Sequence, residues 1–365
     1  MAQVPIARRT LFIERRRAAL GVGGVALALL IVLALGAVFD GAMRDVTRYI
    51  DTADADVFVA QSGVRNMHMS LSALPSEAVA DVRSVDGVER ADPILYETSP
   101  LSVGGARQLS YMIGYHVGRP GGPVEITDGE EPGPDEIVLD TDAADKLGVG
   151  MGDRVSAMGR PWRVSGLTEG MTNITNTISY VRFADFANAR EMQRTVSYIL
   201  VATSDPQAVA TSIEQRTGLV ALTTERFSGE ERRIVQDMSA DIMRIMTVSG
   251  LLIGLAVVVL VLYSATLSRL RDIGLMKAIG ASNRRVAVLV LVQAAWTVLP
   301  ALSIALLTTL GLSVASSSLG AGVPMWLSPG AVARVGATAL LLGAAGAIAP
   351  LARVVRVEPA SVFRR

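Results

Sequence analysis

The placement of long charge-free apolar segments constrains this chain more than any other feature. One segment, 18–39, lies near the start, and three more follow after about two hundred mainly polar residues. A helix of about 20 apolar residues crosses the hydrocarbon core of a bilayer, which is roughly 30 Å thick. The sequence therefore predicts an α-helical membrane protein with four transmembrane helices, arranged one plus three. A large α+β extracytoplasmic domain is expected between the first and second helices.

The expected segments follow the apolar and charged stretches of the chain. They are a cytoplasmic basic segment (1–17), a transmembrane helix (18–39), an extracytoplasmic α+β domain with a helical stalk at each end (40–244), a second transmembrane helix (245–268), a cytoplasmic helical loop (269–285), a third transmembrane helix (286–312), an extracytoplasmic loop (313–330), a fourth transmembrane helix (331–352) and a cytoplasmic tail (353–365).

Charge predicts the orientation of these segments. Five arginines and one glutamate precede the first span, and five basic residues accompany Asp272 in the 269–285 loop. Residues 40–244 hold 19 basic and 31 acidic residues. Short loops rich in Lys and Arg remain in the cytoplasm, so both termini are expected there. A cleaved signal peptide is the alternative for the first segment, but its apolar region is usually only about 7–15 residues long.

The predicted extracytoplasmic domain contains no cysteine, so a packed core and not disulfides must hold it together. Helical spacing predicts stalks over 40–50 and 234–245, with two short interfacial helices as the alternative. Between them we predict strands at 56–60, 110–115, 136–139, 154–158, 162–167, 177–183 and 197–202, helices at 76–82, 143–147 and 206–215, and an exposed loop at 119–134.

The sequence shows no pattern typical of catalysis or nucleotide binding. The two histidines, His68 and His116, lack the spacing of a zinc site or a catalytic triad, and both are expected at the surface or in loops. No G-x-x-x-x-G-K-[ST] motif is present, so the chain is not expected to cradle nucleotide phosphates as a P-loop does. No ionisable residue lies in the middle of a span, which disfavours an ion- or proton-coupled transporter.

The 269–285 loop carries the most specific pattern in the chain. Its apolar residues give a short helix a broad apolar surface, and Gly280 can end that helix. Such a helix either lies against lipid headgroups or inserts into the groove of a partner protein. The apolar surface by itself leaves both alternatives open.

The loop resembles the signature of FtsX/MacB-type ABC transporter permeases, which runs approximately R-x-R-E-I-G-x-x-x-A-x-G-A-S. Asp272 replaces the usual Glu, and the closing segment 358–364 is similar to the family's D/E-P-x-x-A-L-R. Residues 74–93 and 136–167 resemble the MacB-type periplasmic domain. The residues of the loop that match the signature are Arg269, Arg271, Ile273, Gly274, Ala278, Gly280, Ala281 and Ser282.

This resemblance implies a non-catalytic permease subunit in a bacterial plasma membrane. It would pair with two copies of a separate ABC ATPase and with a second permease copy or paralogue. A periplasmic adaptor or substrate protein would be an additional partner, and no nucleic acid is implied. ATP and Mg would be bound by the ATPase, with no cofactor or metal in this chain. The ATPase-coupling residues implied are Arg269, Arg271, Asp272, Ile273, Gly274, Met276, Lys277, Ala278, Ile279, Gly280 and Ala281.

The implied function is the transmission of ATP-driven motion to the extracytoplasmic domain, for export or extraction of a lipophilic molecule, a glycolipid or a lipoprotein. Two alternatives remain open. One is FtsX-like signalling that activates a cell-wall hydrolase without transport, and the other is a membrane-anchored receptor that has no ATPase partner. Copurification with an ATPase distinguishes the receptor from the other two.

Overall fold

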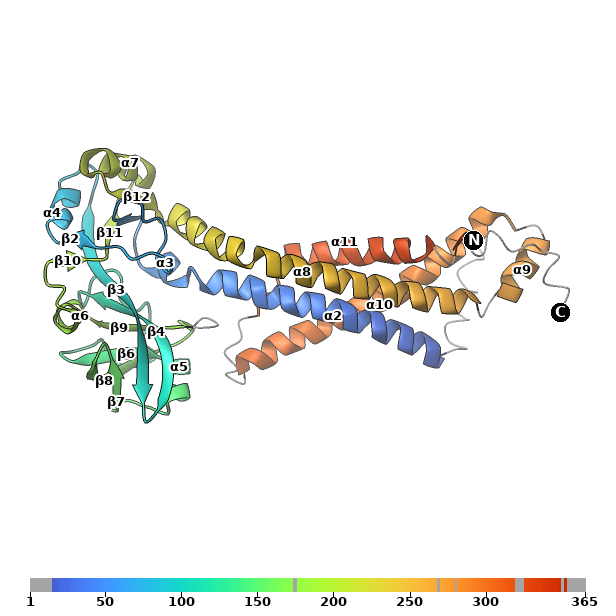
Figure 1. The fold of residues 1–365 in the computed structure, drawn as a ribbon, viewed down its shortest axis with the longest axis horizontal. Coiled ribbons are helices and arrows are strands. Elements are labelled where there is room, and N and C mark those ends of the chain that lie inside the picture. Colours follow the sequence, from blue (N-terminus) through green and yellow to red (C-terminus); the bar gives the residue numbers. More distant parts are fainter. Residues whose placement is uncertain are drawn as a thin grey trace. The chain divides into compact units, whose positions relative to one another are not determined.

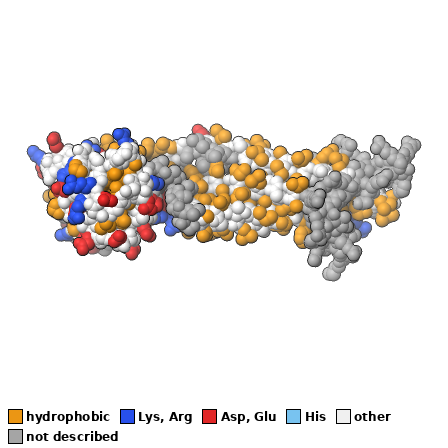
Figure 2. All heavy atoms as spheres, turned by 90° about the horizontal axis from the view of Figure 1, so that it is seen from below, with side chains coloured by type: hydrophobic (Ala, Val, Ile, Leu, Met, Phe, Trp, Pro, Cys, Tyr) orange, Lys and Arg blue, Asp and Glu red, His pale blue; other side chains and the backbone are white. Residues whose placement is uncertain are grey.

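The computed structural model describes residues 15–172, 176–267, 270–279, 281–318, 325–348 and 351–352. The chain divides into two compact units, which are treated separately below. The helical unit comprises Met1–Gly41, Ser239–Leu319 and Met325–Arg365, and the α/β unit comprises Ala42–Met238 with Gly320–Pro324. Figure 2 shows the chemical contrast between them, because hydrophobic side chains dominate the helices whereas acidic and basic side chains gather on the α/β unit.

The α/β unit is built on one large sheet and one two-stranded sheet (Figure 1). The large sheet has the order β12-β1-β11-β3-β4-β9-β6-β8-β5, and β7 pairs with β3 and β8. Its strands are β1 (Val57–Ala60), β3 (Arg90–Val103), β4 (Ala106–Tyr115), β5 (Asp128–Gly129), β6 (Glu136–Asp140), β7 (Arg154–Ala157), β8 (Arg160–Thr168), β9 (Thr177–Arg182), β11 (Tyr198–Ala202) and β12 (Val220–Thr223). The small sheet pairs β2 (Leu74–Pro75) with β10 (Thr195–Val196).

Strand β3 joins the two halves of the large sheet. Its first residues, Arg90 to Ile94, pair antiparallel with β11, and residues 95–103 pair antiparallel with β4. The strand was not predicted, because Pro93 and Pro100 lie inside it and proline is uncommon within strands. The seven predicted strands are all present with small differences at their ends, and the predicted loop 119–134 contains the short strand β5.

Four short helices pack on these strands: α4 (Ala78–Arg83), α5 (Thr141–Leu147), α6 (Phe183–Arg190) and α7 (Pro206–Thr217). Gly148 ends α5 in the left-handed conformation, and Pro206 occupies the start of α7, as the sequence predicts. The predicted cap at Ser76 is wrong, because α4 begins after Glu77, whose side chain makes no capping hydrogen bond. Helix α6 was not predicted.

The α/β core depends on large side chains. Trp162, Tyr115, Tyr180 and Tyr198 are among the bulkiest fully buried residues. The Trp162 indole N–H donates to the Ala157 carbonyl at 2.9 Å, which satisfies its polar group inside the core. A domain without disulfides is thus stabilised by buried aromatic area and by paired polar groups.

Long helices make up most of the described part of the helical unit. They are α2 (Arg15–Asp45), α8 (Thr224–Leu267), α10 (Asn283–Ser318) and α11 (Pro329–Gly346), with the short α9 (Leu270–Ala278) between α8 and α10. Within the described residues, three helices are long and apolar enough to cross a membrane: Ala19–Asp45, Asn283–Ser316 and Pro329–Gly346. In α8 the apolar segment Val248–Ser264 is shorter.

The two predicted stalks differ in the structure. Helix α2 ends at Asp45, and a turn at 46–47 separates it from α3 (Arg48–Thr52), so the first stalk is not one continuous helix. The second stalk is continuous with the apolar segment, because α8 is a single helix of 44 residues. Its first part, up to Met238, belongs to the α/β unit.

Candidate functional site

The predicted coupling segment forms helix α9 followed by a tight connection to α10. The Ile279 N–H donates to the Leu275 carbonyl at 3.1 Å, and the Ala281 N–H donates to the Met276 carbonyl at 2.9 Å. The Ser282 carbonyl then accepts from Arg285 and Val286 in the first turn of α10. These bonds close the end of α9 and start the first turn of α10.

The apolar side chains of α9 point in two directions. Ile273 is 4% exposed and packs on Val286, with Met276 partly buried beside them. Leu275 and Ile279 are 53% and 80% exposed. Residues four apart lie on one face of a helix, so these two side chains form an apolar patch that the described part of the chain leaves open. Exposed apolar patches of this kind are typical of protein or membrane contacts.

The structure sorts the predicted coupling residues into three groups. Ile273, expected in the apolar seat for the ATPase, packs on Val286 of α10. Met276, Lys277 and Ala281 are half-buried, and Ala278 and Ile279 are exposed. Arg269 and Gly280 lie outside the described residues, as do the side chains of Arg271, Asp272 and Gly274. Leu275, which belongs to the exposed patch, was missed as a site residue although its spacing from Ile279 indicates a shared face.

A second candidate site is the first part of α8, residues 224–232, which we call the base of α8. It lies inside the α/β unit. The Thr224 N–H donates to the Asp56 carbonyl at 2.9 Å, next to strand β1. Phe227 is fully buried and stacks on Phe58 of β1, with ring centroids 4.9 Å apart and planes at 11°. The first turns of α8 are therefore packed into the aromatic core beside the sheet.

Glu231 pins a loop to this helix from a fully buried position. One carboxylate oxygen accepts from the Met67 N–H at 2.7 Å, and the other lies 2.8 Å from His68 Nδ1. His68 lies in a loop, as expected, and its side chain is only 7% exposed. Burial, with a smaller contribution from the Glu231 charge, raises the pKa of Tyr198. That phenol stays protonated and donates to the Asn66 carbonyl.

The neighbouring residue, Arg232, ties the same helix to the other chain segment that leaves the α/β unit. Its guanidinium donates to Thr47 Oγ1 at 2.9 Å and to Asp51 Oδ2 at 3.0 Å. The Ser228 hydroxyl donates to the other Asp51 oxygen at 2.5 Å. Helices α3 and α8 are thus cross-linked by charge-assisted hydrogen bonds, which are stronger than neutral ones.

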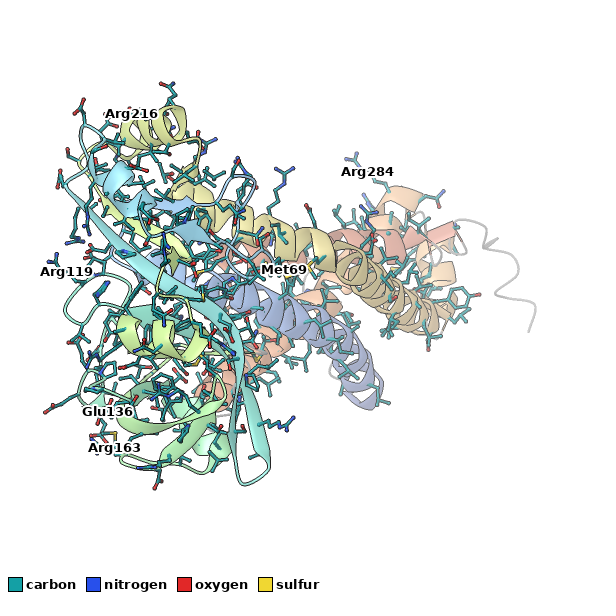
Figure 3. All side chains as sticks on the ribbon, turned by 60° about the vertical axis from the view of Figure 1, so that its left-hand side comes forward. Met69, Arg119, Glu136, Arg163, Arg216 and Arg284 are labelled. Carbon is teal, nitrogen blue, oxygen red and sulfur yellow. The ribbon has the colours of Figure 1, made fainter. Side chains whose placement is uncertain are left out.

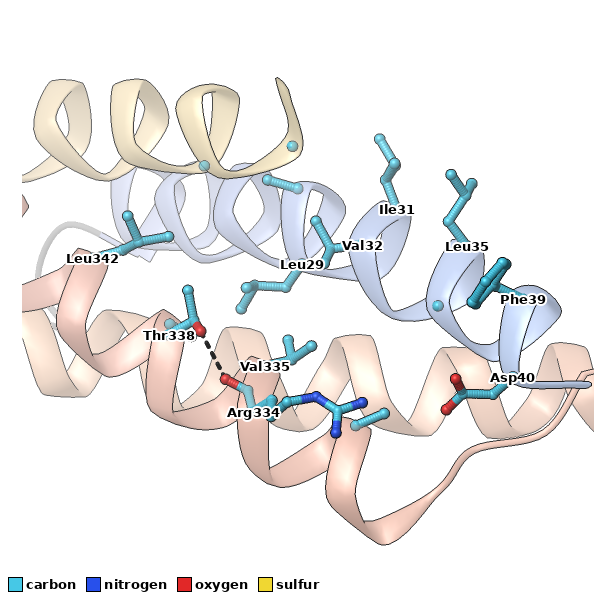
Figure 4. Close-up of a pocket in the computed structure, with 16 residues that line it drawn as sticks. Leu29, Ile31, Val32, Leu35, Phe39, Asp40, Arg334, Val335, Thr338 and Leu342 are labelled. Carbon is cyan, nitrogen blue, oxygen red and sulfur yellow. Dashed lines mark hydrogen bonds between the residues drawn. The ribbon is translucent and has the colours of Figure 1, made fainter. Parts of the chain in front are cut away.

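A third candidate site is an apolar cavity of about 390 Å³ in the helical unit (Figure 4). Leu29, Val32 and Leu35 of α2 line it on one side, and Val335 and Leu342 of α11 line it on the other. Two charged side chains, Asp40 and Arg334, are also part of its lining. The Asp40 carboxylate accepts from the Ser328 hydroxyl at 2.8 Å. The cavity can hold an apolar chain beside a charged group.

Two protein-family descriptions cover most of the chain. Residues 18–217 match the MacB-like periplasmic core domain, and residues 244–359 match the FtsX-like permease C-terminal region. The first match alone spans more than half of the sequence. The chain belongs to the MacB/FtsX-type permeases of ABC transporters, as the resemblance of its loop and its α/β unit predicts.

Relatives of similar length support this class. The chain is 26% identical over 363 residues to an uncharacterized ABC transporter permease of Mycobacterium tuberculosis, with 96% of each chain covered. It is 24% identical over 363 residues to another of Mycobacterium bovis, also with 96% of each covered.

Two solved structures show a weaker likeness. The extracellular domain of the noncanonic ABC-type transporter YknZ from Gram-positive bacteria is 15% identical, with a TM-score of 0.35, and the match covers 47% of this chain and 99% of that one. The periplasmic region of MacB from Actinobacillus actinomycetemcomitans is 13% identical, with a TM-score of 0.37, and the match covers 49% and 93%. The family membership rests on the sequence matches.

Proposed function

We propose that this permease transmits ATP-driven motion from a separate ABC ATPase to its α/β unit, and that the motion extracts or exports a lipophilic molecule. The observation that carries the proposal is the base of α8. A helix that bears an apolar segment is fixed to the α/β core by Phe227, Glu231 and Arg232, so displacement of the helix moves the sheet with it.

The proposed topology has four spans, with α8 contributing the second through Val248–Ser264. Both termini and α9 lie in the cytoplasm, and the α/β unit lies outside, because the basic residues concentrate beside the spans. The chain lacks cysteine, so single cysteines can be labelled without background. Lys277→Cys should react with an impermeant maleimide only after the membrane is opened, whereas Arg107→Cys should react in intact cells. The reverse pattern would refute this orientation.

The proposed ATPase contact is the exposed patch of Leu275 and Ile279, together with Ala278. The predicted polar contributors, Arg271, Asp272 and Lys277, would surround it. An amphipathic helix that presents apolar residues i and i+4 is a common insert for a partner's groove. Ile273 supports the contact indirectly, because it packs α9 against α10.

The experiment that tests this contact compares two variants with the same added charge. Ile279→Asp places a carboxylate in the patch, and Ser282→Asp places one at the start of α10, where Asp is a favourable cap. We expect Ile279→Asp to reduce copurification of the ATPase from native membranes at least about tenfold, since burying an unpaired charge costs several kcal/mol. Ser282→Asp should retain it. Equal retention in both variants, or no ATPase with the unaltered chain, would overturn the proposal.

The lipophilic substrate class is supported by the cavity between α2 and α11. Its apolar lining suits acyl chains, and Arg334 can pair with an anionic headgroup. Ala339→Trp should fill the cavity, because Ala339 lines it and is 2% exposed. We expect this variant to keep the ATPase but to lose lipid-stimulated ATP hydrolysis.

A further inference from the structure

The α/β unit contains an open cleft of about 880 Å³ that belongs to none of the sites above. Helix α4, the start of β3, the turn 116–119 after β4 and the start of α6 form its walls. Figure 3 shows Arg119 on that turn, at the surface of the unit. A neighbouring hollow over residues 118–124 shares Arg90 and Arg119 with the cleft.

Three guanidinium groups, those of Arg83, Arg90 and Arg119, line the cleft. Arg90 is already neutralised, because its Nε lies 2.9 Å from the buried Asp92 carboxylate and its Nη2 lies 3.0 Å from Asp54. Arg119 is 59% exposed, and its Nη1 lies a long 4.0 Å from the Asp92 carboxylate.

Arg83 is held in a fixed position at the cleft. Its Nε and Nη2 both donate to the Ala91 carbonyl, at 3.0 and 2.7 Å. These bonds aim the guanidinium without cancelling its charge, because a carbonyl is neutral. Glu89 is the opposing exposed carboxylate in the lining. Arg83 and Arg119 are therefore the cations left to meet a ligand, within a unit that is acidic overall.

His116 adds a hydrogen-bonding group between these cations. Its ring stacks on Phe183, with centroids 4.5 Å apart and planes at 14°. Burial lowers the pKa of His116, the Asp92 charge opposes this, and the charges of Arg119 and Arg83 lower the pKa further. The imidazole thus reports on the electrostatic potential that both arginines create in the cleft.

We infer that this cleft binds the phosphate group of a ligand, with Arg83 and Arg119 as the cationic partners and His116 as a hydrogen-bonding partner. Guanidinium groups pair with phosphate through two parallel hydrogen bonds, which favours arginine at such sites. Val79, Val117 and Phe183 add apolar surface to the lining, which suits a phosphate carried by an organic molecule. The proposal is independent of ATPase coupling, because all of its residues belong to the α/β unit.

The chain has only two histidines, so imidazole NMR signals can test the site in the full chain. The chain would be solubilised in maltoside, which carries no phosphate, and titrated with inorganic phosphate at constant ionic strength. We expect the His116 titration midpoint to rise by about half a pH unit or more, since a bound anion favours the charged imidazole. His68 lies outside the cleft, against Glu231, and the chemical shift of its signal should not respond to phosphate, so it serves as the internal reference. The variant His116→Gln assigns the two signals.

Two variants with the same change in charge test whether phosphate binds in the cleft. Arg119→Gln should raise the half-saturating phosphate concentration at least about tenfold, the loss expected for one charge-assisted hydrogen bond. Arg107→Gln, on an exposed residue of β4 outside the cleft, should leave it unchanged. An unshifted His116 midpoint, or equal effects of the two variants, would overturn the proposal.

Parallel titrations separate two sources of the phosphate. Dihexanoyl phosphatidic acid presents it as a lipid headgroup, and dihexanoylglycerol presents the same chains without it. Tighter binding of the phosphatidic acid than of inorganic phosphate supports a lipid headgroup as the ligand. Equal binding of the two supports a free or water-soluble phosphate. Binding of dihexanoylglycerol as tight as that of phosphatidic acid would overturn the role of the phosphate.

Discussion

The cores of the α/β unit and of the helical unit are filled by different kinds of side chain. The α/β core contains fully buried Trp, Tyr and Phe residues packed among aliphatic side chains, and hydrogen bonds satisfy polar groups such as the Trp162 indole. The buried cluster of the helical unit consists largely of Ala and Val. Glycines there allow close approach of helices, as where a Cβ on Gly21 would meet Val261 at 2.7 Å.

The difference follows from the surroundings of each unit. In water, large apolar side chains gain free energy from burial, whereas helices in lipid gain mainly from close packing. Large interlocking side chains and buried polar bonds fix one arrangement of the α/β unit. Small residues along the helices leave contacts that can shift with little rearrangement. The comparison indicates a stiff core in the α/β unit and a more adaptable one in the helical unit.

The largest loss of stability is expected when a buried aromatic ring is removed from the base of α8. Phe227→Ala should reduce the free energy of unfolding of the α/β unit by about 3–5 kcal/mol, because it leaves a cavity against Phe58. Leu262→Ala, at a residue only 1% exposed in the helical unit, should cost about 1–2 kcal/mol, because mainly packing contacts are lost. Chemical denaturation of the full chain, followed by near-ultraviolet circular dichroism, measures both. Equal costs would remove the distinction between the units.

The next effect concerns two adjacent carboxylates. Glu231→Ala should cost about 3 kcal/mol, because it leaves the Met67 N–H and His68 without their buried partner. Glu230→Ala should cost less than about 1 kcal/mol, because it loses only an exposed ion pair with Arg65 at 3.2 Å. Thermal unfolding in maltoside compares the two. A cost for Glu231→Ala as small as that of its neighbour would contradict a rigid base for α8.

A smaller effect distinguishes two glycines of α2. Gly21→Ala should destabilise the helical unit by about 1–2 kcal/mol, because its methyl group would overlap Val261. A Cβ on Gly23 meets nothing within 4 Å, so Gly23→Ala should be neutral or stabilising by up to about 1 kcal/mol through helix propensity. Resistance of the helical unit to denaturing detergent ranks the variants. Destabilisation by both would mean that the close contact with Val261 is not what distinguishes Gly21.

The smallest effect depends on pH. The pKa of His116 lies below its usual 6.5, so below that pH the unfolded chain binds this proton more readily than the folded chain. The free energy of unfolding therefore falls as the pH falls through this range. His116→Gln removes the proton site, and we expect a smaller decrease in melting temperature between pH 7 and pH 5 than in the unaltered chain. An identical pH profile would contradict the lowered pKa.

Local signals in the sequence predicted much of the fold. Short apolar runs located seven strands, and Gly148 and Pro206 marked the end and the start of helices. Local signals could not predict contacts between segments that are far apart in the sequence. Glu231 binds the Met67 backbone 164 residues away, and no local pattern at either position indicates this pairing. In the candidate coupling helix, periodicity indicated an apolar surface, but only the position of Val286 shows that Ile273 faces inward.

Strand β3 connects the proposed phosphate-binding cleft to a distant part of the α/β unit. Arg90 and Asp92, at the beginning of the strand, line the cleft, while Val103 at its far end pairs with Ala106. The strand is hydrogen-bonded to β11 over its first part and to β4 over the rest, so one continuous segment links the cleft to the β3–β4 hairpin. A ligand that draws the cleft walls together would therefore displace the distant β3–β4 hairpin. By the same coupling, a force applied to that hairpin would change the affinity of the cleft for the ligand.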